Sequence, residues 1–317
     1  MIRFEGAGKR YGAAVAVDRL DLDVPEGETC ALIGPSGCGK STSLRMVNRL
    51  VAPDEGRVLL GGRDVAESDP VRLRRGIGYV LQGVGLFPHR SVAGNVATVP
   101  ALLGWSRARV SERVDAMLAL VGLDPATYRA RRPDALSGGE RQRVGVARAL
   151  AADPPVLLMD EPFGAVDPLA RGALQREIGA LLRSLRKTVL IVTHDIDEAL
   201  ILADRIAVMR GGRLVQAATP EALLARPADA FVAEFVGRER ALRRLSLASA
   251  GDLAEPGEAP EVPEIAPDTD LRAALSRMLE TGATRLRLAG PEPRVLTLEA
   301  LRGAVNEERA APGDGPS

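Results

Sequence analysis

The chain has 317 residues, of which 46% are hydrophobic, so it can form one large domain or two ordinary ones with a sizeable buried core. Its 42 basic and 42 acidic residues cancel, so overall charge gives no reason to expect a nucleic acid or an anionic lipid surface as partner. No apolar run approaches the roughly 20 residues that span a bilayer. The cysteines, Cys30 and Cys38, lack the spacing of a disulfide or metal site. A soluble protein of a reducing compartment is expected, with a peripheral place in any membrane process.

The N-terminal part of the chain is predicted to form β-strands joined by turns. The apolar runs place them at Ile2–Phe4, Val15–Val17, Leu20–Val24, Thr29–Ile33, Arg57–Leu60 and Ile77–Val80. Tyr11 is expected in a loop between the first two strands. No secretory signal pattern is present, because Arg3, Glu5 and Lys9 interrupt the first residues.

The pattern becomes helical from about residue 91 to residue 152 and then alternates. Helices are predicted at 110–121, 139–152, 169–185 and 196–203, and strands at Val156–Met159, Val189–Val192 and Ile206–Met209. Strands that alternate with helices favour a mostly parallel sheet covered on both faces. The expected fold class is therefore α/β, with an antiparallel β part and a helical subdomain at about 91–152.

The composition changes after Gly237, which divides the chain into predicted domains at 1–237 and 238–317. Residues 251–270 are acidic and contain four prolines, which predicts an extended linker. A short amphipathic helix at Asp270–Thr281 and strands at Arg285–Leu288 and Arg294–Leu298 follow, and their apolar residues are expected to form a small core of their own. Residues 310–317 are expected to be disordered.

The stretch from Gly34 to Ser41, Gly-Pro-Ser-Gly-Cys-Gly-Lys-Ser, matches the loop that holds nucleotide phosphates. It lies between a predicted buried strand and the start of a predicted helix. Free backbone N–H groups and the helix dipole then face an anion. Lys40 is one of only three lysines in an arginine-rich chain, and its compact ammonium suits a position between two phosphates. A chance glycine-rich turn is the alternative.

Two adjacent carboxylates, Asp160 and Glu161, end the apolar run that begins at Val156. Ligands of α/β sheets bind at this end of the strands. Asp160 is expected to hold Mg²⁺ together with the Ser41 hydroxyl, and Glu161 to polarise an attacking water. The alternative is a strand end capped by solvated acids.

The segment Leu136-Ser-Gly-Gly-Glu140 resembles the signature of the ATP-binding cassette (ABC) family, Leu-Ser-Gly-Gly-Gln, with Glu140 in place of glutamine. The resemblance covers residues 2–235 and implies an ATPase that uses ATP and Mg²⁺, with Glu161, His194 and Lys40 in catalysis. It implies a homodimer in which Ser137 reaches the ATP of the opposite subunit. It places nucleotide contacts at Tyr11, Gly34, Pro35, Ser36, Gly37, Cys38, Gly39, Lys40, Ser41, Thr42, Gln82, Ser137, Gly138, Gly139, Glu140 and Asp167, and metal contacts at Ser41, Gln82 and Asp160.

Within the family, residues 70–80, 85–89 and 99–105 and the Met46–Leu50 segment resemble importers of quaternary amines such as glycine betaine, choline and carnitine. The resemblance implies membrane permease subunits as partners, indirectly a solute-binding protein, and a peripheral place on the cytoplasmic face of the membrane. The segment at 266–305 resembles at most one CBS-type regulatory unit. Other readings stay open: an ABC importer ATPase for amino acids or polyamines, a soluble ABC ATPase of DNA repair or translation, or a P-loop small-molecule kinase.

Overall fold

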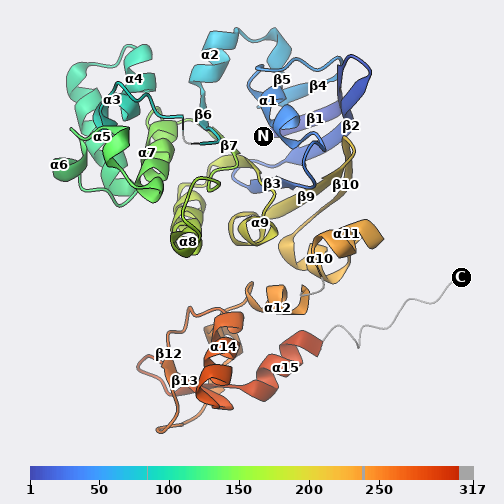
Figure 1. The fold of residues 1–317 in the computed structure, drawn as a ribbon, viewed down its shortest axis with the longest axis vertical. Helices are drawn as coiled ribbons and strands as arrows, with labels where there is room; N and C mark the ends of the chain where they lie inside the picture. The colour runs from blue at the N-terminus through green and yellow to red at the C-terminus, as the bar shows by residue number, and fades with distance from the viewer. Residues whose placement is uncertain (84, 238–239, 307–317) are drawn as a thin grey trace, which may run out of the picture. The chain divides into compact units, whose positions relative to one another are not determined.

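The computed structural model describes residues 1–83, 85–237 and 240–306 (Figure 1). The chain folds into two compact units, Met1–Thr219 and Pro220–Ser317. The first unit ends before Gly237, and the domain boundary at Gly237 stays a prediction. The disorder expected at 310–317 concerns residues outside the described part of the chain.

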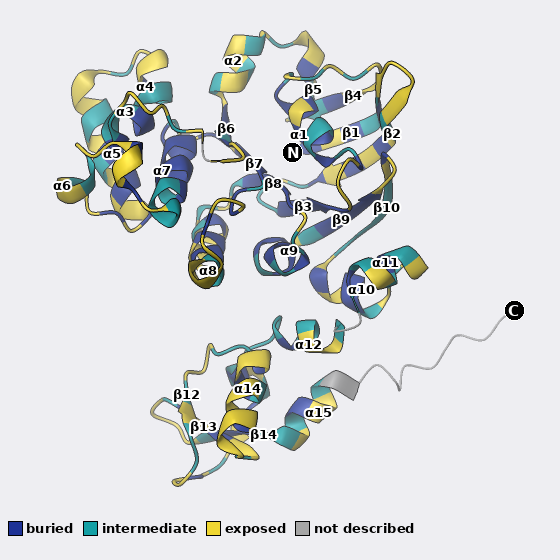
Figure 2. Ribbon diagram, in the orientation of Figure 1, coloured by how far each residue is buried: buried dark blue, intermediate teal, exposed yellow. Residues whose placement is uncertain are grey.

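A six-stranded sheet with the order β10-β9-β3-β8-β7-β6 forms the centre of the first unit (Figure 1). Neighbouring strands are parallel, except for the antiparallel pair β9 and β10. Every residue of β3, β7 and β8 is buried, as expected for parallel strands covered on both faces (Figure 2). The strands are β3 (Thr29–Ile33), β6 (Ile77–Val80), β7 (Val156–Asp160), β8 (Thr188–Val192), β9 (Arg205–Arg210) and β10 (Arg213–Ala218).

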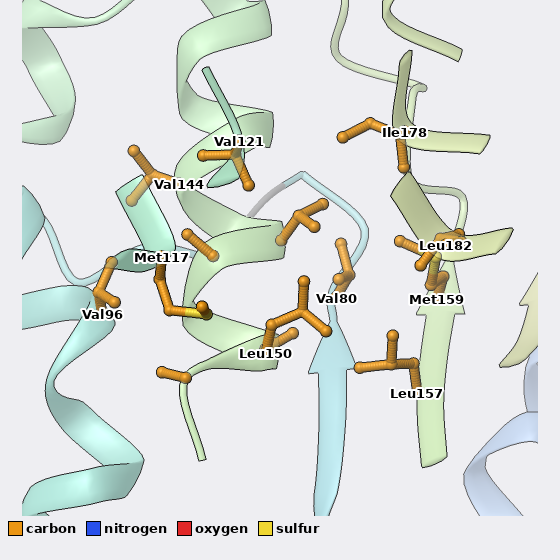
Figure 3. Packing of buried hydrophobic residues seen from close by; sticks show 14 of the residues in the cluster. Val80, Val96, Met117, Val121, Val144, Leu150, Leu157, Met159, Ile178 and Leu182 are labelled. Carbon is orange, nitrogen blue, oxygen red and sulfur yellow. The ribbon is translucent and has the colours of Figure 1, made fainter. Parts of the chain in front are cut away.

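Alternate residues of these strands enter two different hydrophobic cores. Leu157 and Met159 of β7 join the core formed with the helical region, whereas Leu158 joins the core formed with the antiparallel sheet and α1 (Lys40–Val47). The period of two in a strand sends successive side chains to opposite faces. Figure 3 shows the first core, where Leu150 of α7 (Gly138–Leu150) lies near Val80 of β6.

The antiparallel sheet of the first unit has the order β2-β1-β4-β5. Two predictions are wrong here. The strands expected at Val15–Val17 and Leu20–Val24 are one strand, because the β1–β2 pairing absorbs irregularities as register shifts instead of ending. Tyr11 is the last residue of β1, paired with Ala14, and not a loop residue. The strands are β1 (Ile2–Tyr11), β2 (Ala14–Val24), β4 (Glu55–Leu60) and β5 (Arg63–Asp64).

Most of the remaining helices of the first unit begin at a side chain that caps the first turn. Ser91, Ser106, Asp124, Asp167 and Asp195 each accept a hydrogen bond from a backbone N–H group of the helix that follows. The helical region expected at about 91–152 is present. The helices are α2 (Pro70–Arg75), α3 (Val92–Val96), α4 (Thr98–Leu102), α5 (Arg107–Leu120), α6 (Pro125–Tyr128), α8 (Pro168–Leu185) and α9 (Ile196–Leu202), with 3-10 turns η1 (Val65–Glu67) and η2 (Pro133–Ala135).

The second unit has a four-stranded sheet of order β11-β14-β13-β12 and a separate hydrophobic core. The expected apolar residues fill that core: Leu271, Met278, Leu286 and Leu288 are buried. The elements are α10 (Pro220–Ala225), α11 (Ala230–Phe235), α12 (Arg240–Leu245), α13 (Ala250–Leu253), β11 (Glu255–Pro256), β12 (Glu264–Ile265), α14 (Leu271–Thr281), β13 (Arg285–Leu288), β14 (Arg294–Thr297) and α15 (Leu298–Asn306).

The prediction of an extended linker at 251–270 is wrong. The segment supplies the two edge strands of this sheet: β11 pairs with β14, and β12 pairs with β13. Ala254 and Ala259 are buried, and Ile265 packs against the core. Proline is tolerated here because edge strands leave some backbone N–H groups without a strand partner.

Candidate active site

The glycine loop from Gly34 to Ser41 connects the end of β3 to the start of α1, as the sequence predicts. Gly34 and Gly39 have φ angles of 147° and 102°, which side chains disfavour. A Cβ atom at Gly34 would come within 2.2 Å of the Met209 carbonyl oxygen, and one at Gly39 within 2.3 Å of the Ala16 carbonyl oxygen. The loop is therefore packed closely against its surroundings at both glycines.

The Lys40 side chain is buried inside this loop. Its Nζ atom donates to the carbonyl oxygens of Gly34 at 2.7 Å and Pro35 at 2.9 Å, and lies 3.8 Å from Cys38 Sγ. Among the described residues it has no carboxylate partner. Gly39, at the N-cap of α1, offers no side chain to the first N–H groups of the helix. A buried ammonium without a counterion beside uncapped N–H groups is a preformed anion site that fits a phosphate.

Ser41 and Asp160 meet beside the loop. Ser41 Oγ donates to Asp160 Oδ1 at 3.0 Å, and the Asp160 side chain is 2% exposed. Arg45 Nη2 lies 3.4 Å from the other carboxylate oxygen. The sequence reasoning missed Arg45, although its position four residues after Ser41 places it on the same face of α1. Two oxygen groups beside a phosphate loop suit Mg²⁺, which protein sites bind through one or two carboxylates and the substrate's phosphates. In the described part of the chain, no group of three or more His, Cys, Asp or Glu side chains forms an all-protein metal site.

Glu161, Gln82 and His194 lie together, because they follow three neighbouring strands of the parallel sheet. They come after β7, β6 and β8, whose carboxyl ends share one edge. Glu161 Oε2 accepts a hydrogen bond from Gln82 Nε2 at 3.0 Å, and its Oε1 lies 3.5 Å from His194 Nδ1. Glu161 itself has a φ angle of 45°, and its backbone N–H donates to Val192. Asp160 and Glu161 are consecutive, yet their carboxylates have different partners.

The signature segment caps α7. Ser137 Oγ accepts a hydrogen bond from the Glu140 N–H group, and Glu140 Oε2 accepts one from the Ser137 N–H group. Tyr128 donates to the other oxygen of Glu140 at 2.6 Å. This hydrogen bond, followed by the one from Ser137, lowers the pKa of Glu140. A Cβ at Gly138 would come within 2.7 Å of the Ala165 carbonyl oxygen, so this turn lies against the Gly164–Asp167 loop.

The structure does not bring every predicted contact residue into one place. In the described residues no hydrogen bond or ion pair joins Ser137–Glu140 to the phosphate loop. Asp167 caps α8 through the Leu169 N–H group. Tyr11 is 53% exposed at the end of β1, 5.6 Å from the Lys9 ammonium by its ring centroid. Of the remaining predicted nucleotide contacts, Gly139 and Thr42 are half-buried, and Pro35, Ser36 and Gly37 are exposed.

Known proteins resemble this chain over most of its length. Residues 17–164 match the family described as ABC transporter. The osmoprotectant import ATP-binding protein OsmV of Salmonella typhimurium is 53% identical over 80% of this chain and 68% of that protein. The glycine betaine uptake system ATP-binding protein YehX of Escherichia coli is 50% identical over 89% of this chain and 92% of that protein.

Solved structures agree with this match. The ATP-binding cassette MJ0796, as a dimer bound to ADP and phosphate in a post-hydrolysis state, aligns with a TM-score of 0.61 at 30% identity over 69% of this chain and 98% of that one. The protein cbiO1 of Clostridium perfringens aligns with a TM-score of 0.65 at 28% identity over 72% of this chain and 91% of that one.

The fold and the site thus define a P-loop ATPase with a cassette signature. The chain belongs to the ABC transporter ATP-binding proteins. It hydrolyses ATP and uses Mg²⁺ as its cofactor, as the sequence predicted. None of the described helices combines the length and the apolar character that crossing a membrane would require.

Proposed function

We propose that this ATPase energises the import of quaternary amine compatible solutes: glycine betaine, choline or carnitine. The observation that carries the proposal is the 50% identity to a glycine betaine uptake protein along 92% of that protein's length. The Bacillus subtilis protein OpuCA, a glycine betaine, carnitine and choline transport ATP-binding protein, is also 50% identical over 77% of this chain.

A polyamine is the competing solute. A spermidine and putrescine import ATP-binding protein of Frankia alni is 48% identical over 82% of this chain, although the match spans 56% of that protein. Uptake of labelled glycine betaine, choline, carnitine and spermidine by a strain lacking this chain separates the two. The wild-type gene, but not a Glu161→Gln gene, is expected to restore uptake of a quaternary amine. Restored spermidine uptake alone would establish the polyamine instead.

The phosphate loop and Lys40 provide the binding half of the proposed mechanism. When ATP binds, the Lys40 ammonium is proposed to give up its hydrogen bonds to two carbonyl oxygens and to contact the β- and γ-phosphates instead. The N–H groups of the loop then surround the phosphates. Ser41, Asp160 and Gln82 would hold Mg²⁺, which supplies positive charge beside the phosphates when it is bound. Tyr11 stacks on the adenine, which its exposed ring at the end of β1 permits.

Glu161 provides the hydrolytic half. Its carboxylate, held between Gln82 and His194, orients and polarises the attacking water, and His194 steadies the γ-phosphate. Glu161→Gln keeps the shape but removes the charge. This variant is expected to bind ATP and to hydrolyse it at least about 10²-fold more slowly. Near-normal steady-state ATPase activity of the purified variant would reject this role.

A homodimer is proposed to complete the site. In each chain Ser137, Gly138, Gly139 and Glu140 would contact the ATP held by the other subunit, with Asp167 at the interface. The dimeric cassette MJ0796, 31% identical to this chain with a TM-score of 0.62, supports the arrangement. Closure on ATP and opening after hydrolysis would drive the transporter between its two states.

A groove of about 280 Å³ is the proposed docking place of a membrane permease subunit. Leu81 and Phe87 line it, from the segment that follows β6 and contains Gln82, together with Ile77 and Val99. Leu81 and Phe87 are exposed large apolar residues, typical of an interface.

Contact with a permease at this groove would place the chain on the cytoplasmic face of the membrane. Phe87→Asp is expected to abolish solute uptake while the purified chain keeps its ATPase activity, and unchanged uptake would reject the docking place. A solute-binding protein would act on the far side.

The second unit is proposed to contain one CBS-type regulatory unit in residues 266–305. The element order α14-β13-β14-α15 and the buried Leu271, Met278 and Leu286 support a folded module of this kind. A module that binds differently to two states can bias their equilibrium without supplying catalytic groups. A chain ending at Gly237 is expected to keep ATPase activity and to lose its response to ionic strength in reconstituted transport. Superimposable salt curves would indicate an inert tail.

A further inference from the structure

Glu198 on α9 is a buried carboxyl that the proposed mechanism does not use. Its side chain lies where α9, α8 and the turn after β8 meet, and the residue is 4% exposed. Within the described part of the chain, Glu198 Oε1, Gln175 Nε2 and Arg171 Nε are buried without a partner in hydrogen-bonding geometry. Three such groups in one place require an explanation, because each unsatisfied polar atom costs stability.

Burial and one neighbouring carboxylate favour the neutral form of Glu198. Burial raises its pKa to about 8, and the neighbouring Asp195 carboxylate adds to the increase. Three neighbours oppose this increase in the pKa: the hydrogen bond from Thr193, the charge of Arg171 and the Gln175 amide. At neutral pH the side chain is therefore a carboxylic acid with one O–H donor.

This acid lies between two loops of the active site. On one side, Asp195 donates its N–H group to Thr193 Oγ1 at 3.0 Å, and the Asp195 carboxylate accepts from the N–H groups of Asp197 and Glu198. His194 is the residue between Thr193 and Asp195. On the other side, Arg171 donates to the Val166 carbonyl oxygen at 3.1 Å, in the loop that leads into α8.

We propose that Glu198 is a positioning residue whose buried carboxyl joins the turn carrying His194 to the first turns of α8, and so holds His194 beside Glu161. The inference rests on the role proposed for His194. It predicts that ionisation of Glu198 places a second negative charge beside Asp195 and loosens the turn. Hydrolysis then slows, whereas ATP binding at the phosphate loop does not change.

The decisive experiment measures kcat and KM for ATP between pH 6 and 9.5 with the full-length chain. Wild-type kcat is expected to fall about tenfold from pH 7 to pH 9, as a group with a pKa near 8 ionises. Glu198→Gln mimics the neutral acid, so its kcat is expected to change less than about twofold over the same range. KM is expected to stay constant in both proteins. A falling limb in Glu198→Gln identical to that of the wild type would overturn the proposal.

Two further variants keep the test sharp. Gln175→Met removes an interaction that lowers the pKa of Glu198, so the falling limb is expected to move to higher pH. If Gln175→Met leaves the limb where it is, the proposal fails even if Glu198→Gln does not fold. Leu200→Ala, a buried residue of the same helix, is the control: it lowers thermal stability and leaves the pH profile unchanged.

The outcome also separates this inference from the proposed mechanism. If Glu161→Gln abolishes hydrolysis while Glu198→Gln follows the wild-type pH profile, only the positioning role fails. If Glu161→Gln stays active, the mechanism fails whatever Glu198 does.

The pH dependence of stability gives an independent readout. The native carboxyl keeps a proton that the unfolded chain loses above pH 4.5, so wild-type stability falls between pH 4.5 and 8 and then levels. Glu198→Gln is expected to remove that fall, and persistence of the fall would contradict a neutral Glu198.

Discussion

Two turns of this chain place serine and glycine before a helix. They differ in whether side chains of the same chain already cap the N–H groups of that helix. The phosphate loop before α1 has Gly39 at its N-cap and no side-chain cap, and the buried Lys40 has only carbonyl partners. The turn before α7 is already satisfied: Ser137 and Glu140 form a reciprocal capping box, which Tyr128 completes.

The N–H groups of the first turn can therefore bind an anion within the single chain. In the second turn, side chains already occupy N–H groups, and these hydrogen bonds have to break before the same groups can bind an anion. Ser137 Oγ accepts from the Glu140 N–H group, but its hydroxyl proton can still be donated to a phosphate oxygen. The N–H groups of α7 then supply a dipole without a charged side chain comparable to Lys40. This difference fits a loop that binds ATP first and a signature that closes on it afterwards.

The largest loss of ATPase activity is expected from a substitution in the phosphate loop. Lys40→Ala removes the one buried ammonium of the phosphate loop and should lower kcat/KM for ATP by about 10²-fold or more. Lys187→Ala is the matched control, because Lys187 is half-buried outside the phosphate loop and pairs with Asp153. Its ATPase activity is expected to be close to that of the wild type. Equal losses in the two variants would show that Lys40 acts through general stability.

Mixing two inactive chains tests whether the turns serve different subunits. Ser137→Arg blocks the second turn and Lys40→Ala disables the first. In a mixed dimer with sites shared between subunits, one site carries both defects and the other carries none. In a one-to-one mixture about half of the dimers are mixed, and each of these has one working site of two. The activity of the mixture should therefore recover to about a quarter of the wild-type value if the two sites work independently. Confirmed heterodimers without recovered activity would exclude shared sites.

The smallest effect is expected from loosening the capping box. Tyr128→Phe removes the largest cause of the lowered pKa of Glu140. A carboxylate with a lowered pKa stabilises the fold above its unfolded value of 4.5, and this contribution is lost as pH falls through the folded pKa. Tyr128→Phe should lower the melting temperature by about two degrees at most at pH 7 and by less near pH 3. An equal decrease at both pH values would show that the packing of the tyrosine side chain matters instead of its hydrogen bond to the ionised carboxylate.

The sequence determined the parts of the molecule whose signals are local. Buried strands such as Thr29–Ile33 and Ile77–Val80 have the predicted bounds, because a short apolar run between turn residues has few other solutions. The phosphate loop, the Asp160–Glu161 pair and the signature turn were visible for the same reason: each depends on consecutive residues. The short α2, α10 and α12 and the two-residue strands gave no such signal, since their apolar pattern is too brief to show a period.

Only the tertiary structure decided how distant segments meet. The order β8-β7-β6 brings His194, Glu161 and Gln82 together, although they come from three separate stretches of the chain. The proline-rich segment at 251–270 pairs with strands that follow it, so its composition alone suggested a linker. The burial of Glu198 is of the same kind. A glutamate near the start of a helix is ordinarily exposed, and only the packing of α8 against α9 removes its carboxyl from water and raises its pKa.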